Sequence, residues 1–97
     1  MTQPSTATRP VADLIAERLT AALSPTHLAV VNESHHHAGH MGDDGTGESH
    51  FAVEVESAAF AGLSRVARQR LVNRELAELL ATRIHALTMR TRAPGEA

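Results

Sequence analysis

Residues 50–57, HFAVEVES, alternate between apolar and polar side chains, and this alternation limits the folds that the chain can adopt. Successive side chains of a strand point to opposite faces, so one face of this strand carries Phe51, Val53 and Val55, and the other carries Glu54 and Glu56. Such a strand belongs in a sheet with one buried face and one solvated face. Residues 27–33, HLAVVNE, read as a second strand, and we expect the two to form an antiparallel hairpin with a long connection.

A helix is predicted to begin after Pro10, whose missing N–H suits the first turn of a helix. Apolar residues recur from there at the spacing of a single helical stripe, and Ser24-Pro25 ends the helix. The predicted stripe consists of Val11, Leu14, Ile15, Leu19, Ala22 and Leu23.

Two shorter helices and a third strand are predicted in the second half of the chain. Residues 58–62 form a turn or a single helical turn, and Ser64 is the expected N-cap of the helix that follows. We expect Asn73 to end that helix and to cap the next one. Residues 85–91 then alternate as a strand, with His85, Leu87 and Met89 on one side. The predicted apolar stripes of the two helices are Leu63, Val66, Ala67 and Leu71 in the first, and Leu76, Leu79 and Leu80 in the second.

The element order is therefore α-β-β-α-α-β, and helices packed on one face of a three-stranded sheet form the economical α+β architecture. A chain of 97 residues is long enough for a single core. We expect one domain over residues 10–93, a disordered tail over residues 1–9 and a short tail over residues 94–97. No apolar run is long enough to cross a bilayer, so we expect a cytoplasmic protein with no membrane partner.

Residues 32–51, at and between the first two predicted strands, hold five of the seven histidines and four of the six glycines. Imidazole binds transition metals and titrates near neutral pH. Because the chain has no cysteine, a metal held by this chain alone must use nitrogen and oxygen ligands. The segment is either a ligand site or a solvated loop that binds Zn, Ni or Cu adventitiously, and a His-rich metal buffer would be the functional form of the second interpretation.

The sequence offers little support for catalysis. It contains no Ser-His-Asp order, no P-loop and no G-x-G-x-x-G motif. Glu33, Asp43, Asp44 and Glu48 lie near the histidines and could contribute to a hydrolytic metal centre. A glycine-rich loop is poorly suited to the preorganisation that catalysis requires, so we expect that the protein is not an enzyme.

Four arginines, Arg65, Arg68, Arg70 and Arg74, lie along the two predicted helices of the second half. They could contact a nucleic acid, a partner protein or only solvent. The G-x-x-G loop with which KH domains clamp a nucleic-acid backbone is missing, and the chain is acidic overall, with a net charge of −2. These observations favour a protein partner over a nucleic acid.

Several motifs, taken together in their order and spacing, resemble the BolA family. They are NES before the histidine loop, ESHF, F-x-G at residues 60–62, RQRLVN at residues 68–73, and IHAL with a following Thr91. The resemblance covers roughly residues 10–93 and implies a KH-like fold of class II. It also implies association with a monothiol glutaredoxin and a 2Fe–2S cluster held between the two proteins. BolA proteins are also described as DNA-binding transcription regulators that affect stress responses.

Carried over by position, the family's C-terminal histidine ligand corresponds to His85 in IHAL, and the loop ligand falls on His37. His35 and His40 are the reserve candidates for the loop ligand. His50 could orient the loop, but we expect it to be a structural or solvated residue.

The functional expectation is a BolA-like protein that shares a 2Fe–2S cluster with a monothiol glutaredoxin through histidine ligands and holds no cluster alone. Its role would be iron–sulfur cluster trafficking or iron and redox regulation. The alternative is a DNA-binding transcriptional regulator that uses the arginine-bearing helix. The sequence leaves the oligomeric state open and is compatible with a weak homodimer.

Overall fold

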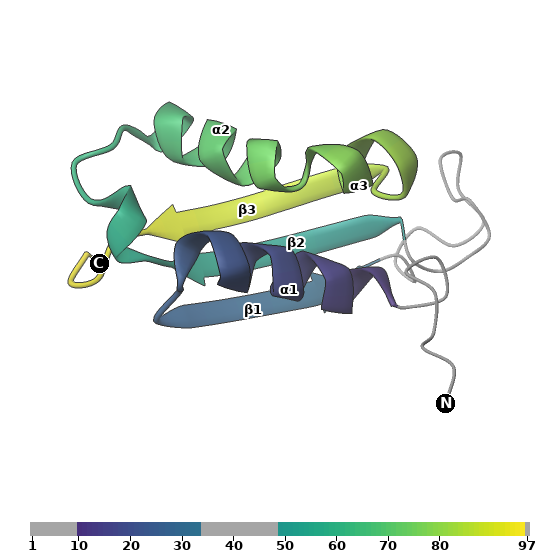
Figure 1. Ribbon diagram of the computed structural model, residues 1–97, viewed down its shortest axis with the longest axis horizontal. Helices are drawn as coiled ribbons and strands as arrows, with labels where there is room; N and C mark the ends of the chain where they lie inside the picture. Colours follow the sequence, from purple (N-terminus) through teal and green to yellow (C-terminus); the bar gives the residue numbers. More distant parts are fainter. Residues whose placement is uncertain (1–9, 34–48, 97) are drawn as a thin grey trace.

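The computed structural model describes residues 10–33 and 49–96 (Figure 1). The elements are α1 (Val11–Leu23), β1 (His27–Asn32), β2 (His50–Glu56), a 3₁₀ turn η3 (Ala58–Phe60), α2 (Arg65–Glu75), α3 (Ala77–Thr82) and β3 (Ala86–Arg92). This order confirms the predicted α+β fold with the sequence α-β-β-α-α-β. The predicted tail over residues 1–9 lies outside the described residues, as do the loop residues 34–48.

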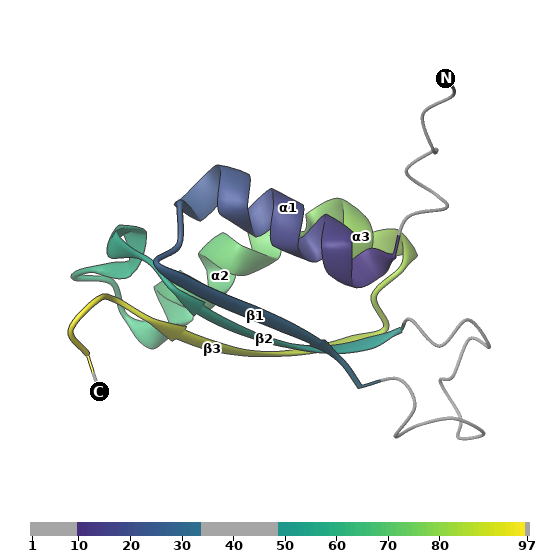
Figure 2. The same ribbon diagram turned by 90° about the horizontal axis from the view of Figure 1, so that it is seen from below.

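The three strands form one sheet in the order β1-β2-β3. β1 pairs with β2 antiparallel, with Val30 opposite Val53, as predicted for the hairpin. β3 pairs with β2 parallel, with Met89 opposite Val53. A parallel pair requires a crossover, which α2 and α3 provide between β2 and β3. Figure 2 shows that the helices lie on one side of the sheet, so the other face of the sheet is not covered by any element that the structure describes.

The core lies between the helices and the covered face of the sheet. The alternation of β2 is confirmed, because Phe51, Val53 and Val55 are buried and the residues between them are partly exposed. The stripe of α1 is confirmed except at Ala22, which is exposed on the last turn, where Leu23 alone faces inward. The buried apolar residues are Val11, Leu14, Ile15, Leu19, Leu23, Phe51, Val53, Val55, Phe60, Val72, Leu76, Leu79, Ile84 and Ala93.

The inward face of α2 differs from the predicted stripe. Ser64 caps the helix as predicted, since its hydroxyl accepts a hydrogen bond from the Ala67 N–H at 3.1 Å. Val66, however, is 54% exposed, whereas Val72 is completely buried. The inner side of the first turn is occupied by the side chain of Arg68, which is only 12% exposed and lies one helical turn before Val72. Of the predicted stripe, Leu71 packs against the core as expected, whereas the placement of Val66 on the inner side was wrong.

Asn73 neither ends α2 nor caps α3. It is exposed within α2, which continues to Glu75. The break between the two helices falls at Leu76, which is fully buried and serves as C-cap of α2 and N-cap of α3. Burial of Val72 and Leu76 on the same side keeps the chain helical through Asn73, so packing overrides the local preference of asparagine for helix ends.

In the described parts of the chain, no helix combines the length and the apolar character that are needed to cross a membrane.

Candidate functional site

Two histidines from different strands meet at the end of the sheet where the loop is attached. His50 is the first residue of β2, and His85 directly precedes β3. Since β2 and β3 are parallel and His50 is opposite Ala86, the two rings become neighbours, with centroids 5.4 Å apart and planes inclined by 52°. The His85 side chain is exposed and that of His50 is partly buried. The structure therefore brings His85, a predicted ligand, next to a histidine that the sequence did not favour.

Ser49 positions both histidines. This serine is completely buried. Its carbonyl oxygen accepts hydrogen bonds from the N–H groups of His85 at 2.7 Å and Ala86 at 3.1 Å, which fixes the start of β3 against β2. Its hydroxyl lies 2.9 Å from Nδ1 of His50. With Nδ1 engaged in this way, a metal would be bound by His50 through Nε2. Ser49 belongs to the ESHF motif, but its role in positioning the two histidines was not predicted.

The two described residues that flank the histidine-rich segment, Glu33 and Ser49, both lie beside this pair. The Glu33 N–H donates a hydrogen bond to the His50 carbonyl at 2.8 Å, and residue 49 follows the loop directly. The predicted ligand His37, with its reserves His35 and His40, lies in residues 34–48 and thus outside the described residues. Within the described ranges 10–33 and 49–96, no group of three or more His, Cys, Asp or Glu side chains could hold a metal ion.

The spacing of the His50 and His85 rings is compatible with binding to one metal ion. Two imidazoles that bind one tetrahedral metal at about 2.0–2.1 Å have ring centroids about 5 Å apart, close to the observed 5.4 Å. Two nitrogens do not complete a tetrahedral site, and the chain contains no cysteine to add thiolates. The described residues alone therefore do not make a complete metal site.

The arginines of α2 are not equivalent. Arg65, Arg70 and Arg74 are exposed, and Arg74 lies 3.7 Å from Glu75. Arg68 instead binds the Glu96 carboxylate through both terminal nitrogens, at 2.6 and 2.8 Å, and donates from Nε to the Leu63 carbonyl at 3.0 Å. Arg68 thus anchors the C-terminal segment to the start of α2, and its use by a nucleic acid would require this contact to break.

Glu96 completes this anchor. The Arg68 guanidinium, together with the Ala93 N–H at 3.0 Å, lowers the pKa of the Glu96 carboxyl to about 2. The same carboxylate raises the pKa of Arg68. The guanidinium carbon of Arg68 also lies 6.0 Å from the centroid of the buried Phe60 ring. Glu96, in the short tail expected over residues 94–97, therefore binds both the start of α2 and the Ala93 N–H.

The two carboxylates on the uncovered face of the sheet are paired with basic side chains of the same sheet. Arg92 donates to Glu54 at 3.1 Å and to Glu56 at 2.8 Å, and His27 lies 3.1 Å from Glu54. The hydrogen bond from Arg92 lowers the pKa of Glu54, and hydrogen bonds from Thr26 and Arg92 lower that of Glu56. These carboxylates are therefore engaged within the sheet, far from the end where the two histidines meet.

Comparison with known proteins agrees with this architecture. Residues 19–96 match the family model described as BolA-like protein. The chain is 51% identical over 85 residues to a Sinorhizobium protein encoded in the cobS 5' region, which covers 87% of this chain and 91% of that protein. It is 47% identical over 81 residues to the DNA-binding transcriptional regulator BolA of Vibrio cholerae, which covers 84% and 73% of the two chains.

A solved structure extends the agreement to three dimensions. The BolA domain of SufE1 from Arabidopsis thaliana superposes with a TM-score of 0.80 at 34% identity, covering 98% of this chain and all of that chain. The sequence match covers most of the chain, and the α-β-β-α-α-β fold is shared with the solved BolA structure. We conclude that the chain belongs to the BolA family.

Proposed function

We propose that this BolA-family protein binds a monothiol glutaredoxin and shares a 2Fe–2S cluster with it, in iron–sulfur cluster trafficking or in iron and redox regulation. The observation that supports the proposal is the exposed His85 ring beside His50, at the end of the sheet where the loop with His37 is attached. His85 would bind one iron of the cluster, with a second imidazole from the same chain.

The count of ligands explains why the cluster would be shared. A 2Fe–2S cluster is usually held by four cysteines, and two histidines can replace the cysteines on one of the two irons, as in Rieske centres. This chain has no cysteine, but it has two imidazole rings whose centroids lie 5.4 Å apart, and this spacing supports the proposal. Thiolates from the partner would then bind the other iron. The bound cluster would supply a one-electron redox centre whose potential depends on these ligands.

Two residues can supply the second imidazole. The family resemblance implies His37, whereas the described geometry favours His50. An extended chain from Glu33 to residue 37 spans at most about 14 Å, and Glu33 is hydrogen-bonded to His50, so either histidine can approach His85. The choice between them is a question for single variants.

The test begins with a cluster reconstituted on a monothiol glutaredoxin, to which this protein is added while visible absorbance and circular dichroism are recorded. We expect new spectral features with wild type, their loss with His85→Ala, and their loss with whichever of His50→Ala or His37→Ala removes the second ligand. His27→Ala is the matched control, because His27 is an exposed histidine at the opposite end of the sheet. Identical spectra for wild type and the His37→Ala, His85→Ala and His50→Ala variants would refute the shared-ligand proposal.

A DNA-binding regulator is the second candidate, favoured by the 47% identity to the Vibrio cholerae protein of that name. The exposed Arg65, Arg70 and Arg74 side chains of α2 would contact phosphates. Binding to promoter DNA should weaken steeply with salt, with a slope of about −0.9 per phosphate contact on logarithmic axes. Arg70→Ala should reduce the size of that slope by about 1. DNA binding that is undetectable, or that does not depend on salt, would exclude this candidate.

A further inference from the structure

The outer edge of β3 presents main-chain groups that could pair with another strand. The Ala86 N–H and the Arg92 carbonyl point toward β2, where they bond Ser49 and Ser57 at 3.1 and 3.0 Å. Main-chain groups alternate in direction along a strand, so those of Leu87, Met89 and Thr91 point away from β2. β3 is an edge strand, and in the described part of the chain none of these outward groups has a hydrogen-bond partner.

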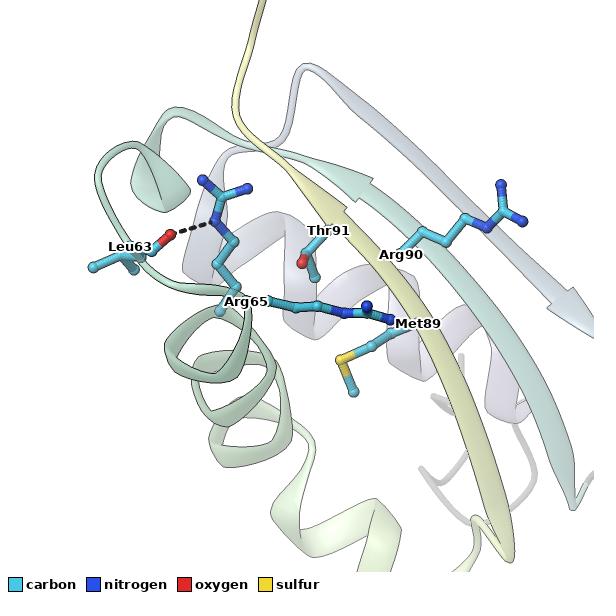
Figure 3. Close-up of a pocket in the computed structure, with 6 residues that line it drawn as sticks. Leu63, Arg65, Met89, Arg90 and Thr91 are labelled. Atoms are coloured by element: carbon cyan, nitrogen blue, oxygen red, sulfur yellow. Dashed lines mark hydrogen bonds between the residues drawn. The ribbon is translucent and has the colours of Figure 1, made fainter. Parts of the chain in front are cut away.

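A hollow of about 430 Å³ lies beside this edge, between β3 and the first turn of α2. Figure 3 shows that Arg65 reaches from α2 to β3 and ends beside Met89, whereas Arg90 extends from β3 to the other side in this view. A second hollow, of about 420 Å³, lies on the uncovered face of the sheet. It is lined by the same two arginines, by apolar side chains and by Glu54, whose carboxylate is already bound by Arg92. The lining of the first hollow is Leu63, Arg65, Arg68, Met89, Arg90 and Thr91.

The charge of this region is positive. Arg68 is neutralised by Glu96, and Arg92 is neutralised by Glu54 and Glu56. Arg65 and Arg90 are exposed, and neither forms an ion pair within 4.0 Å with another described residue. Arg65 and Arg90 thus line both hollows beside a strand edge that has outward-pointing main-chain groups.

We propose that the β3 edge binds an extended acidic segment of a protein partner, which adds to the sheet as a fourth strand. Main-chain hydrogen bonds to Met89 and Thr91 would give the register. Carboxylates on alternate residues would all lie on the uncovered face, where both Arg65 and Arg90 line the second hollow. Side chains directly opposite each other on neighbouring strands lie about 4.5–5.5 Å apart at Cβ, so a carboxylate on the uncovered face of the added strand would lie next to Arg90. The site makes no use of the histidines and is independent of the cluster proposal.

A second copy of this chain and a nucleic acid are both less suitable partners for the β3 edge. Pairing of the β3 edges of two copies would bring the Arg65 and Arg90 side chains of both copies together, and opposed like charges are destabilising. A nucleic acid would use the arginines but not the outward main-chain groups in the spacing of a strand, and no aromatic side chain lines either hollow to stack with a base. An acidic strand uses both features.

The probe is a short fluorescein-labelled peptide in which Glu alternates with Thr or Val, titrated with the full chain and followed by fluorescence anisotropy. Arg65→Gln and Arg90→Gln should each weaken binding by roughly two- to fivefold, as expected for exposed ion pairs. Arg70→Gln, on the same helix but in neither hollow, should leave the affinity unchanged. The same peptide with N-methyl groups on alternate amides retains its carboxylates but loses strand pairing, and it should not bind.

Nuclear magnetic resonance supplies an independent readout. Peptide addition should shift the amide signals of Met89 and Thr91 and slow their hydrogen exchange, while His85→Ala leaves the binding intact. The proposal is overturned if the N-methylated peptide binds as well as the parent peptide, or if neither Arg65→Gln nor Arg90→Gln weakens binding. It is also overturned if a single-stranded oligonucleotide binds at these residues and the peptide does not.

Discussion

Ser49→Ala should weaken the shared cluster site more than it weakens the fold. The substitution removes the hydroxyl that lies 2.9 Å from Nδ1 of His50 but keeps the carbonyl that accepts two N–H groups at the start of β3. Loss of a group that orients a metal-binding histidine typically lowers metal affinity about 10- to 100-fold, or about 1.4–2.7 kcal/mol. Because His50 is partly exposed, water can replace the hydroxyl at Nδ1, and the free energy of unfolding should fall by only about 1 kcal/mol.

Two measurements separate these effects. The rate at which the cluster is lost from the complex with glutaredoxin, followed by visible circular dichroism, should rise about 10- to 100-fold in Ser49→Ala. Ser49→Thr, which keeps the hydroxyl, should recover part of the stability of the cluster. Far-ultraviolet circular dichroism during urea denaturation reports the fold, since the chain has no Trp or Tyr. If Ser49→Ala retains the cluster as long as wild type while His85→Ala loses it, His50 is not the second ligand that Ser49 orients.

Three further predictions concern the fold that carries the site. Ser57→Ala removes a fully buried hydroxyl that donates to the Leu23 carbonyl at 2.6 Å at the end of α1, and urea denaturation should show a loss of about 1–3 kcal/mol. Leu76→Ala empties a completely buried position between α2 and α3 and should cost about 2–5 kcal/mol, whereas Val66→Ala, at an exposed position, should stay within about 0.5 kcal/mol of wild type; equal losses would contradict the placement of these residues. Glu96 has a folded-state pKa of about 2, below its ordinary value of 4.5, so it stabilises the fold above pH 4.5 and that contribution is lost as the pH falls toward 2. The stability difference between wild type and Glu96→Gln should therefore shrink over this pH range, and a difference that is constant with pH would show that the ion pair does not stabilise the fold.

Periodicity predicted the elements that have one strongly apolar side. The stripe of α1 and the alternation of β2 correspond to the observed core, apart from Ala22, because each of these elements packs against the core along its whole length. The N-cap at Ser64 was also predictable, since a serine at a helix start satisfies a main-chain donor locally.

Periodicity failed in α2, where the apolar residues do not define one side. The helix buries Val72 and accommodates the aliphatic stem of Arg68, while Val66 faces solvent. Arg68 is held by Glu96, a residue far from it in the sequence. A contact between residues so far apart in sequence leaves no local pattern. The break between the two helices at Leu76 also has no local signal, because it depends on burial of Leu76 in the core.

The fold class and the family could be predicted from the sequence alone, because both follow from patterns of side chains along the chain. Tertiary structure decided which described histidine lies beside His85 and which arginines remain without ion pairs. Parallel pairing of β2 with β3 places His50 next to His85, although neither residue signals the other in the sequence. The physical reason is that a strand's alternation specifies its buried face, whereas its neighbours and their register are set by how the whole core packs.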